Sequence, residues 1–173
     1  MFEKYEEPRF SVIKKDDAIE LREYAPFLQA EVMIPEGDRE NAANEGFRAL
    51  AGYIFGGNEP KESMAMTVPV TQQKKQNGWT VHFVMPLSRT LQDLPKPDNA
   101  NVKLLPQPSK KMIAITFSGT SSKENLSKHE TLLRNYVAEK KIKTMGDPVY
   151  AFYNSPFSLP FMRRNEIMFE VTN

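Results

Sequence analysis

The stretch GFRALAGYIFGGNEPKESMAMTVPV, residues 46–70, joins a helical pattern to a strand pattern. Its first part repeats apolar residues three and four positions apart, the spacing of one helix face; these are Phe47, Leu50, Ala51 and Ile54. Gly56 and Gly57 then end the predicted helix, because glycine adopts the left-handed conformation that closes a helix without steric cost. After a polar loop, apolar residues alternate as in a strand, at positions 64, 66, 68 and 70. The apolar face of this stretch is either the wall of a site for a flat apolar ligand or a piece of ordinary core.

Strand patterns precede this stretch. Residues 9–34 contain three alternating segments, around 10–12, 19–21 and 28–34, separated by turn residues at 15–17 and 25–26. Asp38 is the predicted N-cap of the first helix, which runs to about residue 55.

Strands and a second helix follow. Asn77-Gly78 predicts a tight turn that opens a strand over residues 79–85. Residues 86–108 are rich in proline and predict a loop with a short strand near 102–105. Ser121 and Glu124 have the spacing of a capping box at the start of the second helix.

The order strand, helix, strand, strand occurs twice, over residues 27–34, 38–55, 64–70 and 79–85, and again over 112–117, 121–142, 149–153 and 165–171. Hairpins with only two helices favour an antiparallel sheet. We therefore predict an α+β fold, a distorted antiparallel β-barrel built from two strand-helix-strand-strand repeats, with both helices packed outside. The length suits one domain over residues 1–173.

Composition narrows the class of protein. The 173 residues include 23 basic and 22 acidic side chains, a formal charge of +1, so no global field favours nucleic acid or an anionic membrane. The lack of cysteine excludes disulfides, thiolate metal sites and a thioether-linked cofactor. The sequence has neither a signal-peptide pattern nor an apolar run of about 20 residues. We expect a cytoplasmic protein without membrane insertion.

The residues that carry chemistry are few. His82 and His129 each lack a second ligand at metal spacing, so we predict no metal site. No nucleophile elbow, phosphate loop or dinucleotide fingerprint occurs, and we assign no catalytic residue.

Two further features leave alternatives open. Arg163-Arg164-Asn165-Glu166 either pairs with ligand carboxylates or forms a structural ion-pair cluster at the last strand. The methionines at 64, 66 and 85 either fill core, line an adaptable pocket or, least in keeping with the pattern, ligate haem iron.

Several segments together resemble the SOUL haem-binding protein family. These are residues 31–70, WTVHFVMP at 79–86, the LP-x-P of Leu94–Pro97, FSG at Phe117–Gly119 and RRNEI at Arg163–Ile167. The resemblance runs from about Tyr5 to the C-terminus. It implies a monomeric, gyrase-inhibitor-like fold of two repeats that binds haem or other tetrapyrroles without an obligatory covalent bond.

The resemblance also implies a ligand site in a hydrophobic cleft beside the first helix. On this sequence the predicted ligand-binding residues are Phe47, Arg48, Leu50, Ala51, Ile54, Met64, Met66 and Met85. Some family members place basic residues where this chain has Asn44 and Gly52, so Arg48 or Arg39 would have to pair with the propionates. In another branch a histidine before the first helix is the proposed iron ligand, and this chain has no histidine before His82.

Three hypotheses follow. The leading one is a haem carrier or buffer that is not an enzyme and holds haem non-covalently, without a strong axial ligand. The second is a tetrapyrrole-modifying enzyme, for which Glu45, Glu62 and Arg48 are the titratable residues near the predicted cleft. The third is an effector-binding or protein-interaction module that uses the same groove.

Overall fold

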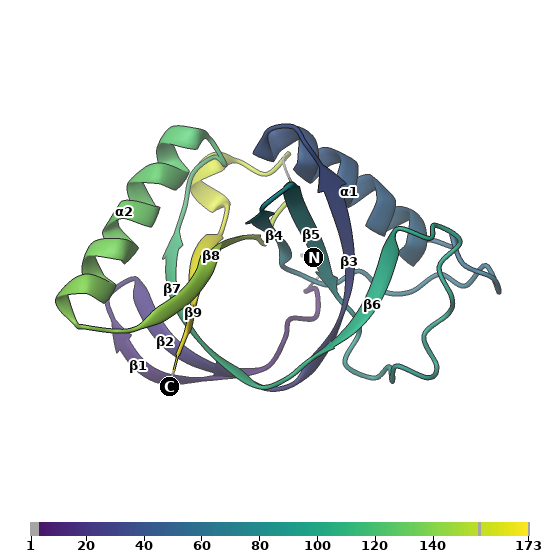
Figure 1. Ribbon diagram of the computed structural model, residues 1–173, viewed down its shortest axis with the longest axis horizontal. Coiled ribbons are helices and arrows are strands. Elements are labelled where there is room, and N and C mark those ends of the chain that lie inside the picture. The colour runs from purple at the N-terminus through teal and green to yellow at the C-terminus, as the bar shows by residue number, and fades with distance from the viewer. Residues whose placement is uncertain (1–3, 156, 173) are drawn as a thin grey trace. The chain divides into compact units, whose positions relative to one another are not determined.

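Within residues 4–155 and 157–172, which the computed structural model describes, the chain forms two units, each with one long helix packed on antiparallel strands (Figure 1). Unit 1 consists of Met1–Pro8 and Pro26–Pro108, and unit 2 consists of Arg9–Ala25 and Ser109–Asn173.

Unit 1 contains β3 (Phe27–Pro35), α1 (Arg39–Ile54), β4 (Val70–Lys75), β5 (Gly78–Val84) and β6 (Val102–Gln107). Its strands lie in the order β4-β5-β3-β6, and every neighbouring pair is antiparallel. The strand predicted near residues 102–105 is therefore confirmed as β6.

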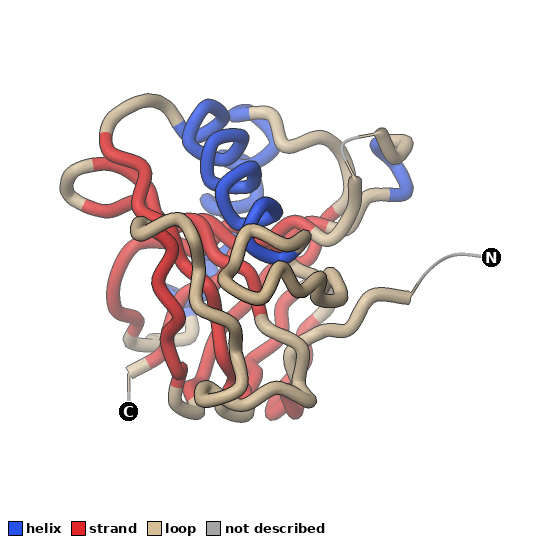
Figure 2. The backbone as a smooth tube through the Cα atoms, turned by 90° about the vertical axis from the view of Figure 1, so that its right-hand side faces the viewer, coloured by secondary structure: helices blue, strands red, loops and turns tan. Residues whose placement is uncertain are grey.

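Unit 2 contains β1 (Phe10–Asp16), β2 (Ile19–Tyr24), β7 (Lys110–Phe117), α2 (Lys123–Glu139), β8 (Thr144–Phe152) and β9 (Asn165–Val171). Its strands lie in the order β1-β2-β7-β9-β8, again antiparallel, with irregular register in β1 and β8. A short 3₁₀ turn, η1 (Pro160–Met162), lies between β8 and β9 and is the short blue segment beside the grey trace in Figure 2.

Glycine at position 46 lets α1 approach the strands of unit 1. A Cβ on Gly46 would lie 2.4 Å from Val81 Cγ2, a distance that no real side chain reaches. Leu50 and Ile54, one and two turns further along the helix, are fully buried in the same core. The helical stripe read from the sequence therefore does face the strands, and its small residue sets how closely the helix packs.

The tight turn predicted at Asn77-Gly78 joins β4 to β5. Gly78 has a φ of +141°, and a Cβ there would lie 2.1 Å from the Ile34 carbonyl oxygen. Only glycine fits this position, because any side chain would collide with the backbone of β3.

Both helices begin at a side-chain N-cap, as predicted, but the cap of the second helix lies one residue later than predicted. Asp38 caps α1, and its side chain accepts a hydrogen bond of 2.8 Å from the Asn41 amide. The predicted cap of the second helix, Ser121, is wrong by one residue, because Ser122 accepts from the Asn125 amide at 3.2 Å. Two adjacent serines offered the same cap chemistry, and the chain uses the second one.

The strand predicted over residues 64–70 is also wrong, since β4 begins at Val70. The Met64 amide donates to the Ile54 carbonyl and the Val68 amide to the Glu6 carbonyl, so this segment does not form a ladder with β5. The apolar alternation that suggested a strand does not match burial here, because Thr67 is buried while Met66 and Val68 are only partly buried. The rest of the fold prediction, an α+β fold with distorted antiparallel strands and two repeats of strand, helix, strand and strand, is confirmed.

Candidate functional site

The predicted ligand-binding residues fall into two groups in unit 1. Four of them belong to its hydrophobic core, with side-chain exposures between 0 and 6%; they are Leu50, Ile54, Met64 and Met85. These side chains support the neighbouring surface from behind, and their packing fills space in the way the core alternative for methionine describes.

The other predicted residues lie nearer solvent. Phe47 is 44% exposed, Arg48 is exposed, and Ala51 and Met66 are half-buried. The Phe47 ring rests on Phe83 of β5, with ring centroids 5.5 Å apart, so its orientation is fixed from below. Fixed aromatic rings with an open face are suited to stacking against a flat ligand.

Two further residues, Phe55 and Gly52, share this helix face and were not among the predicted ligand-binding residues. Phe55, 62% exposed, lies eight positions after Phe47 and one turn after Ala51. Between these rings Gly52 has no atom within 4 Å of the place where a Cβ would stand. We call the surface formed by Phe47, Arg48, Ala51, Gly52 and Phe55 the α1 face. The signal for Phe55 was present as an i, i+8 spacing, but the residue was read only as the helix end.

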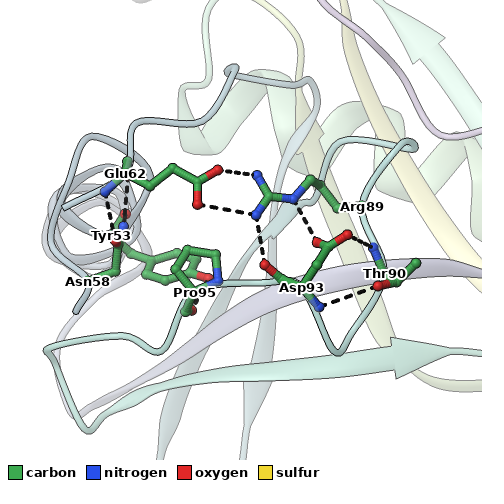
Figure 3. A network of polar contacts seen from close by, with 7 residues as sticks. All are labelled: Tyr53, Asn58, Glu62, Arg89, Thr90, Asp93 and Pro95. Atoms are coloured by element: carbon green, nitrogen blue, oxygen red, sulfur yellow. Dashed lines mark hydrogen bonds and ion pairs between the residues drawn. The ribbon is translucent and has the colours of Figure 1, made fainter. Parts of the chain in front are cut away.

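The C-terminal end of α1 is held by polar contacts with the loop that contains the LP-x-P sequence (Figure 3). Tyr53 Oη donates a hydrogen bond of 2.7 Å to the Pro95 carbonyl. Asn58 Nδ2 donates to the carbonyls of Tyr53 and Glu62, and Asn58 Oδ1 accepts from the Glu62 amide. Burial raises the pKa of Tyr53 to about 12, so the phenol remains a donor at neutral pH.

Arg89 joins the same two loops by ion pairs, as Figure 3 shows. Its Nη1 lies 2.5 Å from Glu62 Oε1, and its Nε lies 2.8 Å from Asp93 Oδ1. Hydrogen bonds from Arg89 lower the pKa of the Asp93 carboxyl, and the hydrogen bond to Glu62 raises the pKa of Arg89. Glu62, one candidate for chemistry in a cleft, is thus a partner of Arg89.

Arg39 and Arg48, the two arginines that could pair with propionates, differ in their contacts and exposure. Arg39 Nη1 donates to Gln72 Oε1 at 3.2 Å, and Gln72 Nε2 returns a hydrogen bond of 2.7 Å to the Arg39 carbonyl. Arg48 is exposed on α1, one position after Phe47. Of the two arginines that the sequence offered for propionates, Arg48 is therefore the better placed.

The threonine of the M-T-x-P-V sequence has a structural contact. Thr67 is buried, and its Oγ1 donates to the Val84 carbonyl at 2.5 Å. This bond ties the irregular segment before β4 to the end of β5.

In unit 2 the R-R-N-E sequence contributes to a buried ion pair, which favours the structural alternative. Glu166 of β9 receives both Nη atoms of Arg22 from β2, at 2.8 and 2.6 Å. Tyr153 Oη donates to the same carboxylate at 2.5 Å, and Thr116 Oγ1 donates at 2.8 Å. The guanidinium of Arg164 lies over the Tyr153 ring, 3.8 Å from its centroid.

The protonation states of this cluster follow from its contacts. Burial alone would raise the pKa of Glu166, but the hydrogen bond and the charge of Arg22 outweigh it and hold that pKa below its ordinary value. Burial raises the pKa of Tyr153 and of Tyr24, so both phenols stay protonated donors at neutral pH.

Both histidines contact neighbouring side chains or backbone within their own unit. His82 Nδ1 lies 2.9 Å from Thr71 Oγ1, and its Nε2 lies 3.5 Å from Glu31 Oε2. His129, on α2, stacks on Phe117 and donates from Nδ1 to the Asn125 carbonyl at 2.8 Å. Within the described residues, no group of three histidine, aspartate or glutamate side chains has the geometry to hold a metal ion.

A separate apolar pocket of about 300 Å³ lies in unit 1. Met85 contributes to it together with Phe27, Leu28, Leu87 and Leu91. It is a second place at which unit 1 offers apolar surface.

The chain is an α+β protein with two helix-on-strand repeats, and its exposed aromatic helix face offers surface for an apolar ligand. The comparison with known families gives the particular family: the model of the SOUL heme-binding proteins matches residues 5–170. The chain belongs to the SOUL heme-binding protein family, as the resemblance predicted.

Curated relatives agree with this assignment. Heme-binding protein 2 of Mus musculus is 28% identical over 157 residues, which cover 86% of this chain and 75% of the relative. Heme-binding protein 1 of Mus musculus is 26% identical over 164 residues, 89% of this chain and 84% of the relative. Haem binding is thus established at the level of the family.

Solved structures show that the fold is shared more widely. The EcmrR C-terminal domain has a TM-score of 0.66 at 12% identity, covering 90% of this chain and 97% of that domain. A hydrolase from Listeria innocua has a TM-score of 0.60, also at 12% identity, over 92% of this chain and 94% of the hydrolase. Among the described residues, no helix is both long and apolar enough to cross a membrane.

Proposed function

We propose that this protein binds haem or another tetrapyrrole reversibly on the α1 face and acts as a monomeric cytoplasmic carrier or buffer. The observation that supports this best is the pair of exposed aromatic rings, Phe47 and Phe55, on one side of a helix. Eight helical positions span ~12 Å along the axis, which suits the length of a flat macrocycle. Membership of the SOUL family and the names of the relatives support a haem or porphyrin ligand.

The surface between the rings supports a planar ligand. Ala51 and Gly52 keep the surface between the rings flat, because neither carries a side chain beyond Cβ. The space above Gly52 is open. Burial of roughly 600 Å² of apolar surface, counted on ligand and protein together, contributes about 15 kcal/mol. Association costs of several kcal/mol reduce this favourable free energy to a net value that corresponds to a micromolar Kd. No bond to iron is needed for such an affinity.

Arg48 supplies the polar contact. It follows Phe47 and precedes Gly52 by one helical turn, so its guanidinium can reach a carboxylate at the edge of a ligand that covers Gly52. Arg48 takes the part that the basic residues play in other family members, whose positions hold Asn44 and Gly52 here.

The carrier role rests on weak, reversible contact. The chain has no cysteine, so a thioether bond to haem is excluded. Both histidines contact residues of the sheets or of α2, which supports binding without a strong axial ligand. The family match over residues 5–170 as one stretch supports treating residues 1–173 as a single SOUL-type domain.

The test is a charge placed in the α1 face. Phe47→Asp should weaken the binding of haem at least about tenfold, because it removes an aromatic contact and places a carboxylate beneath the ring. The matched control is Leu91→Asp, since Leu91 is 40% exposed in the same unit and lines the separate pocket. Titrations that follow the Soret band measure both variants. Loss of binding in Leu91→Asp with unchanged binding in Phe47→Asp would move the site to that pocket.

A further inference from the structure

The two most exposed large apolar side chains of the described residues lie in one loop of unit 2. Phe157 is 96% exposed and Phe161 is 74% exposed, and more than half of Leu159 and Met162 is exposed as well. We call residues 157–162 the apolar loop. Single exposed apolar residues are common on proteins, but four within six positions mark a contact surface.

The backbone of the apolar loop is largely paired within unit 2. The Met162 amide donates to the Leu159 carbonyl at 2.9 Å, and the Arg163 amide donates to the Pro160 carbonyl at 3.2 Å. Arg163 Nε donates to the Ser158 carbonyl at 2.9 Å. These bonds pair backbone polar groups of the loop, while its apolar side chains are exposed. A loop that enters an apolar environment needs this arrangement, because unpaired backbone groups are costly there.

The loop is also fixed to the rest of unit 2. The Gly119 amide donates to the Pro160 carbonyl at 2.9 Å, and Asn165 Nδ2 donates to the Gly119 carbonyl at 2.9 Å. The Arg164 amide donates to Asn154 Oδ1 at 2.6 Å. The apolar side chains are therefore presented on an anchored turn, η1, which Figure 2 draws in blue.

Charge is distributed unevenly between the two units. Unit 2 contains 14 basic and 10 acidic residues, a formal charge of +4, whereas unit 1 contains 9 basic and 12 acidic residues, a charge of −3. The overall charge of +1 hides this asymmetry. The apolar loop belongs to this positive unit, and Arg163, whose Nε donates to the Ser158 carbonyl, directly follows it. Positive charge beside apolar side chains favours an anionic lipid surface.

We propose that the apolar loop inserts its side chains into the interface of an anionic lipid bilayer and docks unit 2 there. A short loop that exposes four apolar side chains suits the fluid interface of a lipid bilayer, into which each side chain can insert separately. This peripheral docking requires no membrane-spanning segment. It goes beyond tetrapyrrole binding, and it would place a carrier where an apolar ligand partitions.

Vesicle co-sedimentation tests the proposal without any haem. The wild-type protein should bind vesicles of phosphatidylcholine mixed with phosphatidylglycerol, and should bind phosphatidylcholine alone more weakly. The double variant Phe157→Ser, Phe161→Ser should lose at least about tenfold in binding, because two apolar rings no longer leave water. The matched control is Phe55→Ser, a 62% exposed phenylalanine in unit 1, which should bind vesicles as the wild type does.

A second readout locates the contact and does not depend on the double variant folding. Tryptophan fluorescence of Phe157→Trp should shift to the blue and be quenched by brominated lipid, while Phe55→Trp should show neither effect. Trp79, the single native tryptophan, gives the background in the unsubstituted protein.

Several outcomes would overturn the proposal. These are no binding of the wild type to either vesicle, equal binding to both vesicles, or unchanged binding in the double variant. Self-association that the double variant abolishes, in a protein that ignores vesicles, would assign the loop to a second copy of this chain instead.

Discussion

The two arginine–carboxylate clusters of this protein have similar bond lengths and opposite surroundings. Arg22 and Glu166 in unit 2 are 2.6 Å apart, with side-chain exposures of 1 and 0%. Arg89 and Glu62 in unit 1 are 2.5 Å apart, with exposures of 19 and 40%. Distance alone would rank them as equals.

Because the two clusters differ in burial, we expect them to contribute differently to the free energy of unfolding. Water screens the Arg89 cluster, so its ion pairs contribute little to the free energy of unfolding. The Arg22 cluster has no such screening, and loss of either partner leaves a charge inside the protein. The comparison predicts that unit 2 depends on its pair, whereas unit 1 uses its pair mainly to hold a loop in place.

The largest expected effect is that of Glu166→Gln. The free energy of unfolding should fall by about 3 kcal/mol, because Arg22 remains buried and keeps only the partly exposed Glu20, at 3.0 Å, as an ion-pair partner. Urea unfolding followed by circular dichroism measures this loss. Glu170→Gln on the same strand is the matched control and should cost less than about 0.5 kcal/mol. Equal losses in the two variants would contradict the assignment.

Replacing both partners should cost less than the two single changes together. Arg22→Met combined with Glu166→Leu removes both charges, so neither is left unpaired. A double-mutant cycle should give a coupling energy of about 1–3 kcal/mol. Additive losses would mean that the two side chains act independently.

Acid should weaken the buried pair. The folded-state pKa of Glu166 is lower than its ordinary value of 4.5, so the unfolded chain binds this proton first. The pair's contribution is therefore present above that value and is lost as pH falls through the folded-state pKa. Unfolding free energies measured from about pH 6 to about pH 3 should decline less steeply in Glu166→Gln than in the wild type. The same slope in both proteins would show that other groups govern acid unfolding.

The smallest expected effect is that of Glu62→Gln. Its cost should stay within about 1 kcal/mol, because the carboxylate is partly exposed and Arg89 keeps Asp93 as a partner. Urea unfolding with Glu45→Gln, an exposed glutamate of α1, provides the reference. A loss comparable to that of Glu166→Gln would erase the distinction between the clusters.

Local patterns predicted most elements of the fold. The helical stripe, the Asp38 cap and the Asn77-Gly78 turn each depend on neighbours within a few positions, and each is confirmed. The prediction of a strand at 64–70 failed because the backbone of this segment pairs with Ile54 and Glu6, which are distant contacts that apolar alternation does not reveal. Ser121 failed because Ser122 carries the same chemistry one position later.

The candidate site could be predicted only in part. The stripe that contains Phe47 and Leu50 is wide, so sequence spacing does not separate side chains that face the core from those at its edge. The α1 face appears only when the strands fix which side is buried. Arg22 and Glu166 are 144 positions apart, and no periodic pattern connects such residues. The register of β2, β7 and β9 aligns Arg22 with Met112 and Met112 with Glu170, so Arg22 reaches Glu166 diagonally across β7.

The central claim is that a flat apolar ligand binds by contact with the α1 face, without a bond to iron. Titration of the wild-type protein with haem and with metal-free protoporphyrin, followed by the Soret band and the fluorescence of Trp79, tests it most directly. We predict saturable one-to-one binding of both compounds with similar micromolar affinity. Binding of haem but not of protoporphyrin would contradict the claim by showing that an iron ligand holds the cofactor. Saturable binding of neither compound would show that tetrapyrroles are not the ligands of this protein.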